Sequence, residues 1–377
     1  MNHYAFVNAP DLALIGFDPH DVERGRRYHR PLYAALLVET TLSAALLAVL
    51  AFTRAGDWLY RPVRDLPWWG ASLAFAALVV GVSFAVQTPL AFWRGFLRER
   101  RWGFSTQRLR GWAADRIKGL LVVAVVTGLL ALSLVGLALA MPSAWPFAAA
   151  GAAALAVVLL SFVAPVVLEP LFNRFAPVAD AELAQDLRAL AERAGVPVRD
   201  VLVADASRRT HKVNAYVSGL GRTRRVVLFD TLLARASARE VRLVIAHELG
   251  HRRDRHVVKA TLLGAAGAVA ATVVVWAALG ERASDPRQLP LVLLLGLGLQ
   301  LVALAPGSAL SRRWERAADR ASLELTEDVE AFESAHRELA RVNLADLAPP
   351  RPLYLLLFSH PTPPERIAAA RAWAAAR

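Results

Sequence analysis

Six long apolar segments constrain the fold of this chain more than any other feature of its sequence. Each is long enough for a helix that crosses a bilayer, since about 20 helical residues span the hydrocarbon core. Hydrophobic residues make up 56% of the chain, which is typical of a membrane protein. We therefore expect a mainly α-helical, polytopic membrane bundle of about six transmembrane helices. The segments lie at approximately 32–53, 69–92, 119–141, 145–168, 257–279 and 290–310.

Three of these segments carry local signals of their own. The third and fourth are joined only by Pro142 and its neighbours, which predicts a helical hairpin. The sixth is interrupted by Gly296, Gly298, Pro306 and Gly307, so the sequence leaves open whether this segment spans the membrane completely.

Basic residues alternate between rich and poor connections. Eight Lys or Arg residues lie in 93–118, none lies next to Pro142, and only Arg282 and Arg287 separate the fifth and sixth segments. The positive-inside rule then places both termini and the 93–118 loop in the cytoplasm, as expected for a multi-pass protein of the inner (plasma) membrane. This topology explains the net charge of +12, and we expect membrane lipids to surround the chain. We expect no nucleic acid partner.

The polar regions divide the chain into further parts. After a cytoplasmic segment at 1–30, the first four transmembrane helices and their basic loop occupy 31–169. Residues 170–256 have the pattern of an α+β domain, with an amphipathic helix over 181–195 and strands at 198–204, 214–219 and 225–230. A transmembrane hairpin at 257–310 separates this first part of the domain from a second part at 311–377.

The motif His247-Glu248-Leu-Gly-His251 carries the chemistry of the chain. Residues four apart lie on the same face of a helix, so two imidazoles can converge on one metal ion. Glu248 lies between them and is suited to act as a general base. Ser237 is a plausible N-cap of this helix, with Glu240 three residues later. We expect the helix to continue through His256 into the fifth span, with the site about 10 Å from the apolar boundary.

A catalytic zinc site needs a third protein ligand. The chain has no cysteine, so His, Asp or Glu must supply it. Glu315 and Asp319 follow the sixth span and are four residues apart, so one could bind zinc while the other holds an imidazole. The alternative is an exposed helix face with Arg–carboxylate pairs. His256, five residues after His251, is expected to point away from the metal.

Glu39 lies within the first span, where a carboxylate is costly. It either faces a polar cavity or pairs with a neighbouring helix. Glu169, at the end of the fourth span, is interpreted as an interfacial residue.

Together these motifs resemble the M48 zinc metallopeptidases, in particular the integral-membrane Ste24 or CAAX prenyl protease branch. The similarity extends over most of residues 28–370. Besides the His247 motif it is carried by Pro89-Leu-Ala-Phe-Trp-Arg-Gly-Phe-Leu, Glu169-Pro-Leu-Phe-Asn-Arg-Phe, Asn214-Ala-Tyr, Val226-Val-Leu-Phe-Asp, Ser311-Arg-Arg-x-Glu-x-x-Ala-Asp319 and Ser359-His-Pro.

The resemblance implies a gluzincin-like peptidase domain on the cytoplasmic side of a helical bundle that encloses a chamber, which Glu39 would face. It implies one Zn²⁺ per chain and Glu248 as the catalytic base. Asp319 would support a ligand, and His360 and Arg366 would lie close to the metal, with His360 suited to bind the oxyanion. The implied zinc ligands are His247, His251 and Glu315, and the implied substrate-binding residues are Asn214, Ala215 and Tyr216.

We therefore expect a zinc metalloendopeptidase that cleaves peptides or proteins, including lipidated or membrane-associated ones, near the cytoplasmic membrane surface. The chain departs from the family pattern in having six spans where eukaryotic members have seven, and Thr362 where proline is usual. Its arginine-rich composition suggests a bacterial source. Bacteria generally lack protein prenylation, so the sequence leaves open whether a prenyl group is required. Two other hypotheses are an inactive membrane scaffold or chaperone and a transporter that uses the intramembrane cavity.

Overall fold

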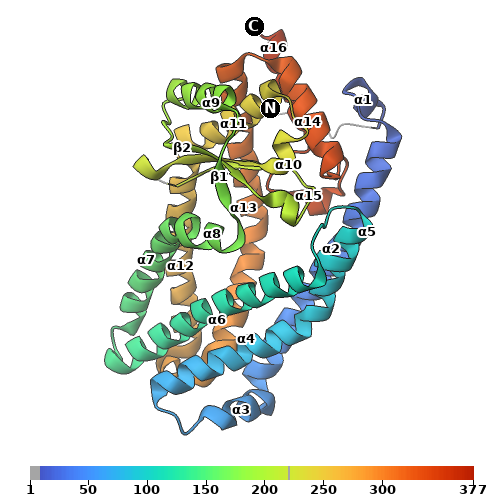
Figure 1. The fold of residues 1–377 in the computed structure, drawn as a ribbon. Coiled ribbons are helices and arrows are strands. Elements are labelled where there is room, and N and C mark those ends of the chain that lie inside the picture. The colour runs from blue at the N-terminus through green and yellow to red at the C-terminus, as the bar shows by residue number, and fades with distance from the viewer. Residues whose placement is uncertain (1–8, 220) are drawn as a thin grey trace.

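The computed structural model describes residues 9–219 and 221–377 and is mainly helical (Figure 1). A short helix α1 (Ala9–Leu14) precedes α2 (Pro19–Phe52), whose first turn is closed by a capping box between Asp18 and Asp21. The chain turns through α3 (Arg54–Tyr60) and η1 (Arg61–Val63). It then returns in α4 (Trp68–Phe92), which continues through the π-helical stretch η2 (Trp93–Arg98) into α5 (Glu99–Arg101).

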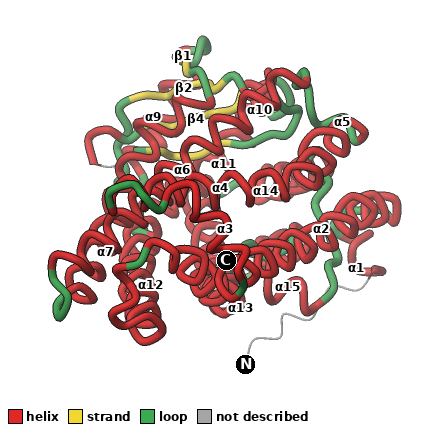
Figure 2. The backbone as a smooth tube through the Cα atoms, turned by 90° about the horizontal axis from the view of Figure 1, so that it is seen from below, coloured by secondary structure: helices red, strands yellow, loops and turns green. Residues whose placement is uncertain are grey.

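The remaining membrane helices form two hairpins. The first joins α6 (Leu109–Ala140) to α7 (Trp145–Val163), which runs on through η3 (Ala164–Leu168) into α8 (Glu169–Phe172). The second joins α12 (His256–Leu279) to α13 (Leu289–Thr326) through η6 (Gly280–Ser284) and η7 (Pro286–Gln288). Figures 1 and 2 show α7 and α12 side by side, so the two hairpins pack directly against each other.

Within the described residues, six helices are long and apolar enough to cross a membrane, as the sequence predicts. The sixth span is among them, and α13 is one continuous helix of 38 residues with Pro306 inside it. Proline removes a single backbone donor, and a helix is the arrangement that satisfies the other backbone groups in a bilayer. The continuity of α13 fixes Glu315 and Asp319 rigidly to the membrane span.

A four-stranded sheet forms beside these helices, in the order β1-β2-β4-β3. The three strands predicted from the sequence are confirmed as β2 (Asp200–Ala204), β3 (Ala215–Ser218) and β4 (Arg225–Phe229). Strand β1 (Phe175–Pro177) was not predicted from the sequence; it has three residues and pairs with the outer side of β2. Strand β3 pairs antiparallel with β4 and forms the other edge of the sheet.

The sheet packs against α9 (Ala181–Arg193) and α11 (Ala238–Arg253), with α10 (Asp230–Leu233) between β4 and α11. Burial of a leucine or isoleucine contributes about 1.5–3 kcal/mol, so this core holds α11 firmly against the sheet. Its fully buried members include Leu187, Leu190, Leu228, Ile245 and Leu249.

Three C-terminal helices complete the domain: α14 (Val329–Val342), α15 (Arg351–Leu357) and α16 (Pro363–Ala375). Helix α14 packs on α11, and both α15 and α16 pack on α13. The C-terminal part of the chain therefore covers the junction between α11 and α13.

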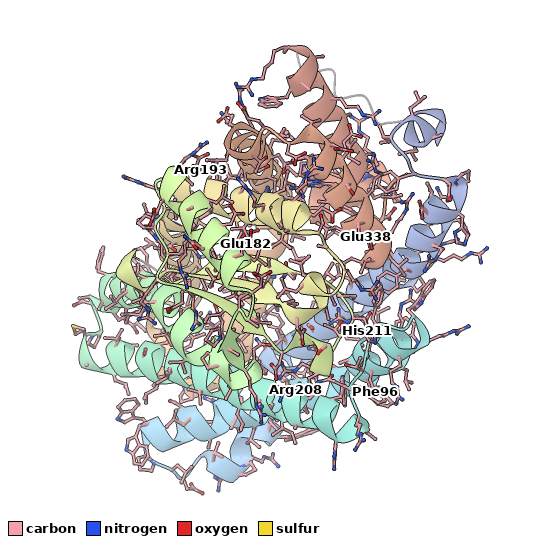
Figure 3. The ribbon with its side chains drawn as sticks, turned by 45° about the horizontal axis from the view of Figure 1, so that its top comes forward. Phe96, Glu182, Arg193, Arg208, His211 and Glu338 are labelled. Atoms are coloured by element: carbon pink, nitrogen blue, oxygen red, sulfur yellow. The ribbon has the colours of Figure 1, made fainter. Side chains whose placement is uncertain are left out.

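The sheet and the membrane helices are tied together by polar contacts at their border. The Arg209 Nε donates to Asp115 Oδ2 on α6 over 2.9 Å, and the His211 N–H donates to the Phe104 carbonyl over 2.8 Å. Figure 3 shows Arg208 and His211 on the side of the sheet domain that faces the membrane helices. Lys212 adds an ion pair with Glu99 at 2.8 Å.

The expected continuation of the motif helix into the fifth span is wrong. Helix α11 ends at Arg253, Asp254 is its C-cap, and Arg255 adopts a left-handed conformation with φ 56°. A single left-handed residue ends the helical hydrogen-bond pattern. The break lets α12 run beside α7 while α11 stays packed on the sheet and on α13.

Candidate active site

Helix α11 begins with the capping box that the sequence predicts. The Ser237 N–H donates to Glu240 Oε2 over 2.8 Å, and the Glu240 N–H donates to the Ser237 hydroxyl over 3.3 Å. The second Glu240 oxygen accepts from Ser334 of α14 over 2.7 Å. The start of the motif helix is therefore anchored both locally and to the C-terminal part of the domain.

Helices α11 and α13 approach each other closely at Gly250. A Cβ atom at this position would lie 2.9 Å from the Cβ of Ala321 and 3.2 Å from the Cα of Ala318. Small residues on both helices thus allow the two backbones to approach closely at Gly250, which directly precedes His251 and lies about one turn after His247. This contact brings Glu315 opposite His247 and His251.

Three side chains converge at this junction. His247 Nε2 lies 3.3 Å from Glu315 Oε2, and His251 Nε2 lies 3.2 Å from Glu315 Oε1. The two histidine Nε2 atoms are themselves 3.2 Å apart. One ligand atom from each residue falls within 4.8 Å of the others, which is close enough for all three to bind one ion.

The surroundings of Glu315 fit a metal ion. The residue is buried, and its Oε2 atom has no hydrogen-bond partner among the described residues. An unsatisfied buried carboxylate oxygen costs several kcal/mol unless a charge compensates it. Two imidazoles and one carboxylate form a ligand set that zinc uses in catalytic sites. The residues present therefore suit a zinc ion.

Asp319 contacts His247 at Nδ1, the ring nitrogen other than the one that faces Glu315. Its Oδ1 lies 2.9 Å from His247 Nδ1, so His247 can present Nε2 to the metal. Burial alone would lower the pKa of His247, but the neighbouring carboxylates of Asp319 and Glu315 raise this pKa to about 9. The same carboxylates would stabilise the positive charge of a bound cation.

Arg366 of α16 holds Asp319 in turn. Its Nε donates to Asp319 Oδ2 over 2.8 Å, and its NH2 group also contacts Asp319 Oδ1. Burial disfavours the charged guanidinium, yet the charges of Asp319, Glu315 and Glu248 keep the pKa of Arg366 raised. Arg366 therefore lies close to the candidate metal site, where it remains a cation beside the acidic side chains.

His360 lies at the open side of the site. Its Nε2 is 3.4 Å from Glu315 Oε1, and its side chain is 59% exposed. The Ser359 hydroxyl and His360 Nδ1 are 2.7 Å apart, which orients the ring. Glu248 is half-buried on α11, between the two histidines in sequence. The exposed His360 ring, as a hydrogen-bond donor, and the Glu248 carboxylate are thus available to a substrate.

His256 is closer to the site than the sequence analysis expects. Its Nδ1 lies 2.9 Å from His251 Nδ1, and its ring stacks on Trp314 with a centroid separation of 5.1 Å. The expectation that it points away assumed a continuous helix. Because the chain turns at Arg255, the His256 ring comes back against His251, where it can fix the orientation of that imidazole.

Strand β3 lies beside α11, and one of its two edges is paired with β4. The Asn214 carbonyl accepts from the Phe229 N–H on β4, so by strand alternation the backbone groups of 213, 215 and 217 face outward. Asn343 caps one end, since its side-chain amide exchanges two 3.2 Å hydrogen bonds with the backbone of Val213. Arg252 caps the other end by donating to the Val217 and Gly219 carbonyls.

The sequence analysis missed both caps, since neither residue belongs to a motif quoted there. Between the caps, Asn214 Oδ1 accepts from the Ala215 N–H over 2.9 Å. The outward groups left for an added strand are therefore the Ala215 carbonyl and the Val217 N–H. Alternation of the strand places these two groups next to each other on one edge.

Two further residues singled out from the sequence take part in ion pairs. Glu169 accepts from Tyr216 over 3.3 Å and from Ser218 over 2.7 Å, and it pairs with Arg225 at 3.0 Å. It thus links the end of the fourth span to β3. Glu39 pairs with Arg94 of η2 at 2.9 Å, which matches the hypothesis of a partner on a neighbouring helix.

Two family models together match almost the whole chain. Residues 177–374 match the model described as Peptidase family M48. Residues 7–174 match the model described as CAAX prenyl protease N-terminal, five membrane helices.

Similar proteins agree with these matches. A Bacillus subtilis protein named as an uncharacterized metalloprotease is 29% identical over 78% of this chain and 72% of its own length. CAAX prenyl protease 1 of Saccharomyces cerevisiae is 33% identical over 50% of this chain and 42% of its own length. The crystal structure of S. mikatae Ste24p has the same fold, with a TM-score of 0.77 and 23% identity over 94% of this chain and 89% of that one.

Proposed function

Because this chain belongs to peptidase family M48 and is an integral-membrane metalloendopeptidase, we propose that it is a zinc enzyme that cleaves peptide bonds near the cytoplasmic membrane surface. The observation that carries the proposal is the convergence of His247, His251 and Glu315, with a buried Glu315 oxygen that lacks a hydrogen-bond partner among the described residues. This ligand set is intact, and Glu248 is present beside it. An inactive scaffold or a transporter would need neither.

In the proposed mechanism, these three residues would hold a zinc ion, which would act as a Lewis acid and lower the pKa of a water molecule. Glu248 accepts the proton of the attacking water and passes it to the leaving amine. His360 donates a hydrogen bond to the oxyanion that develops on the scissile carbonyl. Asp319 and Arg366 hold His247 in the orientation that this chemistry requires.

The substrate would bind as an extended strand along the outer edge of β3. Asn343 and Arg252 occupy the two ends of this edge, so the main-chain contacts of the substrate are limited to Ala215 and Val217. Such edge-strand addition presents backbone carbonyls with little demand on side-chain identity. Asn214 and Tyr216 flank the same position, which supports their proposed role in substrate binding.

We propose that the active site and both termini are cytoplasmic and that the protein lies in the inner membrane. The support is the excess of basic residues in the 93–118 loop and in the peptidase segments compared with the connections near Pro142 and Arg287. Substrates are then peptides or proteins that reach the cytoplasmic membrane surface, including lipidated ones. The relatives named CAAX prenyl protease are the support for lipidated substrates, although the alignment spans less than half of the S. cerevisiae protein.

A cleavage assay with detergent-purified protein tests the proposal. Two matched peptides are used, one unmodified and one farnesylated near its C-terminus, and Glu248→Gln provides the background. We expect zinc-dependent cleavage by the wild-type protein and loss of turnover with full zinc content in Glu248→Gln. Retained turnover in this variant would exclude Glu248 as the base.

The two peptides also distinguish substrate classes. Cleavage of the farnesylated peptide alone would mean that a lipid group is required. Cleavage of both peptides, or of the unmodified one alone, would mean a broader protease suited to membrane-protein quality control.

A further inference from the structure

The membrane bundle contains a cavity of about 1190 Å³ that is separate in its lining from the candidate active site. Helices α2, α4, α6, α7, α12 and α13 all contribute to its wall. The wall is formed mostly by Leu, Val and Ala, with Ser43, Gln87 and Gln300 among the few polar residues. A cavity of this size and character suits a ligand that is largely apolar.

Arg116 of α6 lines this cavity. Its guanidinium lies over the ring of Phe84, 4.6 Å from the centroid. The Nε atom is buried without a hydrogen-bond partner, and no ion pair of Arg116 occurs among the described residues. A cation at the edge of a membrane span is costly unless an anion compensates it.

The carboxylates near Arg116 are already engaged. Glu39 pairs with Arg94 at 2.9 Å. Asp115 accepts from Arg209 over 2.9 Å and from Gln107 over 2.7 Å, and it lies 3.8 Å from Lys118. Two carboxylates therefore face four cations, which are Arg94, Arg116, Lys118 and Arg209. This excess leaves a positive charge at one end of the apolar cavity.

We propose that this cavity binds an amphiphilic anion, with Arg116 as the anion-binding residue. The ligand has one carboxylate or phosphate group at the end of a single acyl-type chain. The anionic group pairs with the Arg116 guanidinium, and the chain lies along the leucine, valine and alanine walls. A neutral chain would leave the charge of Arg116 uncompensated, and a small inorganic anion would leave the apolar wall uncovered.

The inference is tested by equilibrium binding to the full-length protein, purified in a neutral detergent. The probes are palmitate, palmitoyl lysophosphatidate, hexadecanol and inorganic phosphate. Arg116→Gln removes the charge and Arg116→Lys keeps it. Arg110→Gln is the matched control, because Arg110 is an exposed residue of the same helix that does not line the cavity. Metal content and gel filtration establish that each variant is folded.

We expect the wild-type protein to bind palmitate, lysophosphatidate or both at least about tenfold more tightly than hexadecanol or inorganic phosphate, as for a charge-assisted hydrogen bond. Affinity falls by a similar factor in Arg116→Gln and is retained in Arg116→Lys and Arg110→Gln. The tighter of the two anionic probes identifies the headgroup chemistry.

Two results would overturn the inference. One is equal affinity for palmitate and hexadecanol, and the other is unchanged affinity for both anionic probes in a folded Arg116→Gln protein. Displacement of palmitate by an apolar peptide with a free C-terminus, at lower concentration than by lysophosphatidate, would overturn the assignment to a lipid-type ligand. None of these measurements depends on peptide cleavage, so a failure here is distinct from a failure of the proposed function.

Discussion

Glu315 is the candidate metal ligand that α13 contributes to the site. It is buried against two imidazoles, and one of its oxygens has no hydrogen-bond partner among the described residues. We expect Glu315→Ala to lose both zinc and activity, since only two protein ligands would remain. Metal analysis of the purified variant checks this, and an unchanged zinc content would move the third ligand to another residue.

Asp319 should show a milder loss because it acts through His247. Replacing it with Ala removes the acceptor from His247 Nδ1 and leaves the buried Arg366 guanidinium without its carboxylate. We expect zinc affinity to fall about 10–100-fold, as for other residues that orient a metal ligand. Competition with a zinc chelator measures this, with Glu324→Ala, an exposed ion-pair residue of the same helix, as the control. A loss as complete as that of Glu315→Ala would instead make Asp319 a direct ligand.

At the scale of helices, the packing of α11 on α13 depends on Gly250. A methyl group at this position would meet Ala321 and Ala318 at less than normal contact distance, and both neighbours belong to a rigid helix. We expect Gly250→Ala to destabilise the protein by about 1–3 kcal/mol and to lower zinc occupancy by separating His251 from Glu315. Thermal unfolding and metal content are the readouts.

Gly267→Ala on α12 is the matched control, because an added Cβ there meets no atom of the described residues within 4 Å. It should be neutral or slightly stabilising. If Gly250→Ala behaves like Gly267→Ala, the close contact of α11 and α13 does not hold the site together.

The stability of the folded protein depends on pH through His336 of α14. This side chain is buried, stacks on Phe332 and has a pKa lowered to about 3, chiefly by burial and then by the charge of Arg366. The unfolded chain binds the proton near pH 6.5 and the folded one does not, so stability falls as pH decreases from about 6.5 towards 3.

The expected slope is about 1.4 kcal/mol per pH unit for this one group. His336→Gln should lack this component, so the stability difference between wild type and variant should narrow or reverse as pH falls from 7 to 5. Unfolding of both proteins across this range measures the effect. Parallel curves would show that His336 does not titrate in this way.

The part of the site that was predictable from residues alone is the part governed by local geometry. The spacing of His247 and His251 requires only a helix, and the capping box at Ser237 and Glu240 marks where that helix begins. The roles of Glu315 and Asp319 stayed open on spacing alone and were suggested by the family resemblance. Their approach to α11 depends on how α13 packs, which is a tertiary property.

The features that the sequence analysis missed depend on single backbone events. The left-handed conformation of Arg255 turns the chain and brings His256 to His251, although a continuous helix was the better prediction from local propensity. Asn343 and Arg252 reach the edge of β3 only because the sheet has its observed strand order. No periodicity in the sequence encodes such contacts.

For the molecule as a whole, the six spans and the distribution of basic residues lead to one topology. The short turn between α6 and α7 contains Pro142 and lacks basic residues, whereas the 93–118 loop before α6 carries eight. We expect alkaline phosphatase fused after Pro142 to be active, because this enzyme requires the outer side of the inner membrane. A green fluorescent protein fused at the C-terminus should be fluorescent in the cytoplasm.

Exchanging the two reporters provides the control. Green fluorescent protein after Pro142 should then not fluoresce, and alkaline phosphatase at the C-terminus should be inactive. Fluorescence after Pro142 would invert the whole arrangement, because α7, α12 and α13 alternate from that turn. The candidate active site on α11 and α13 would then open to the outer side, and cytoplasmic substrates would be excluded. The orientation of one turn therefore decides which substrate pool the protease can reach.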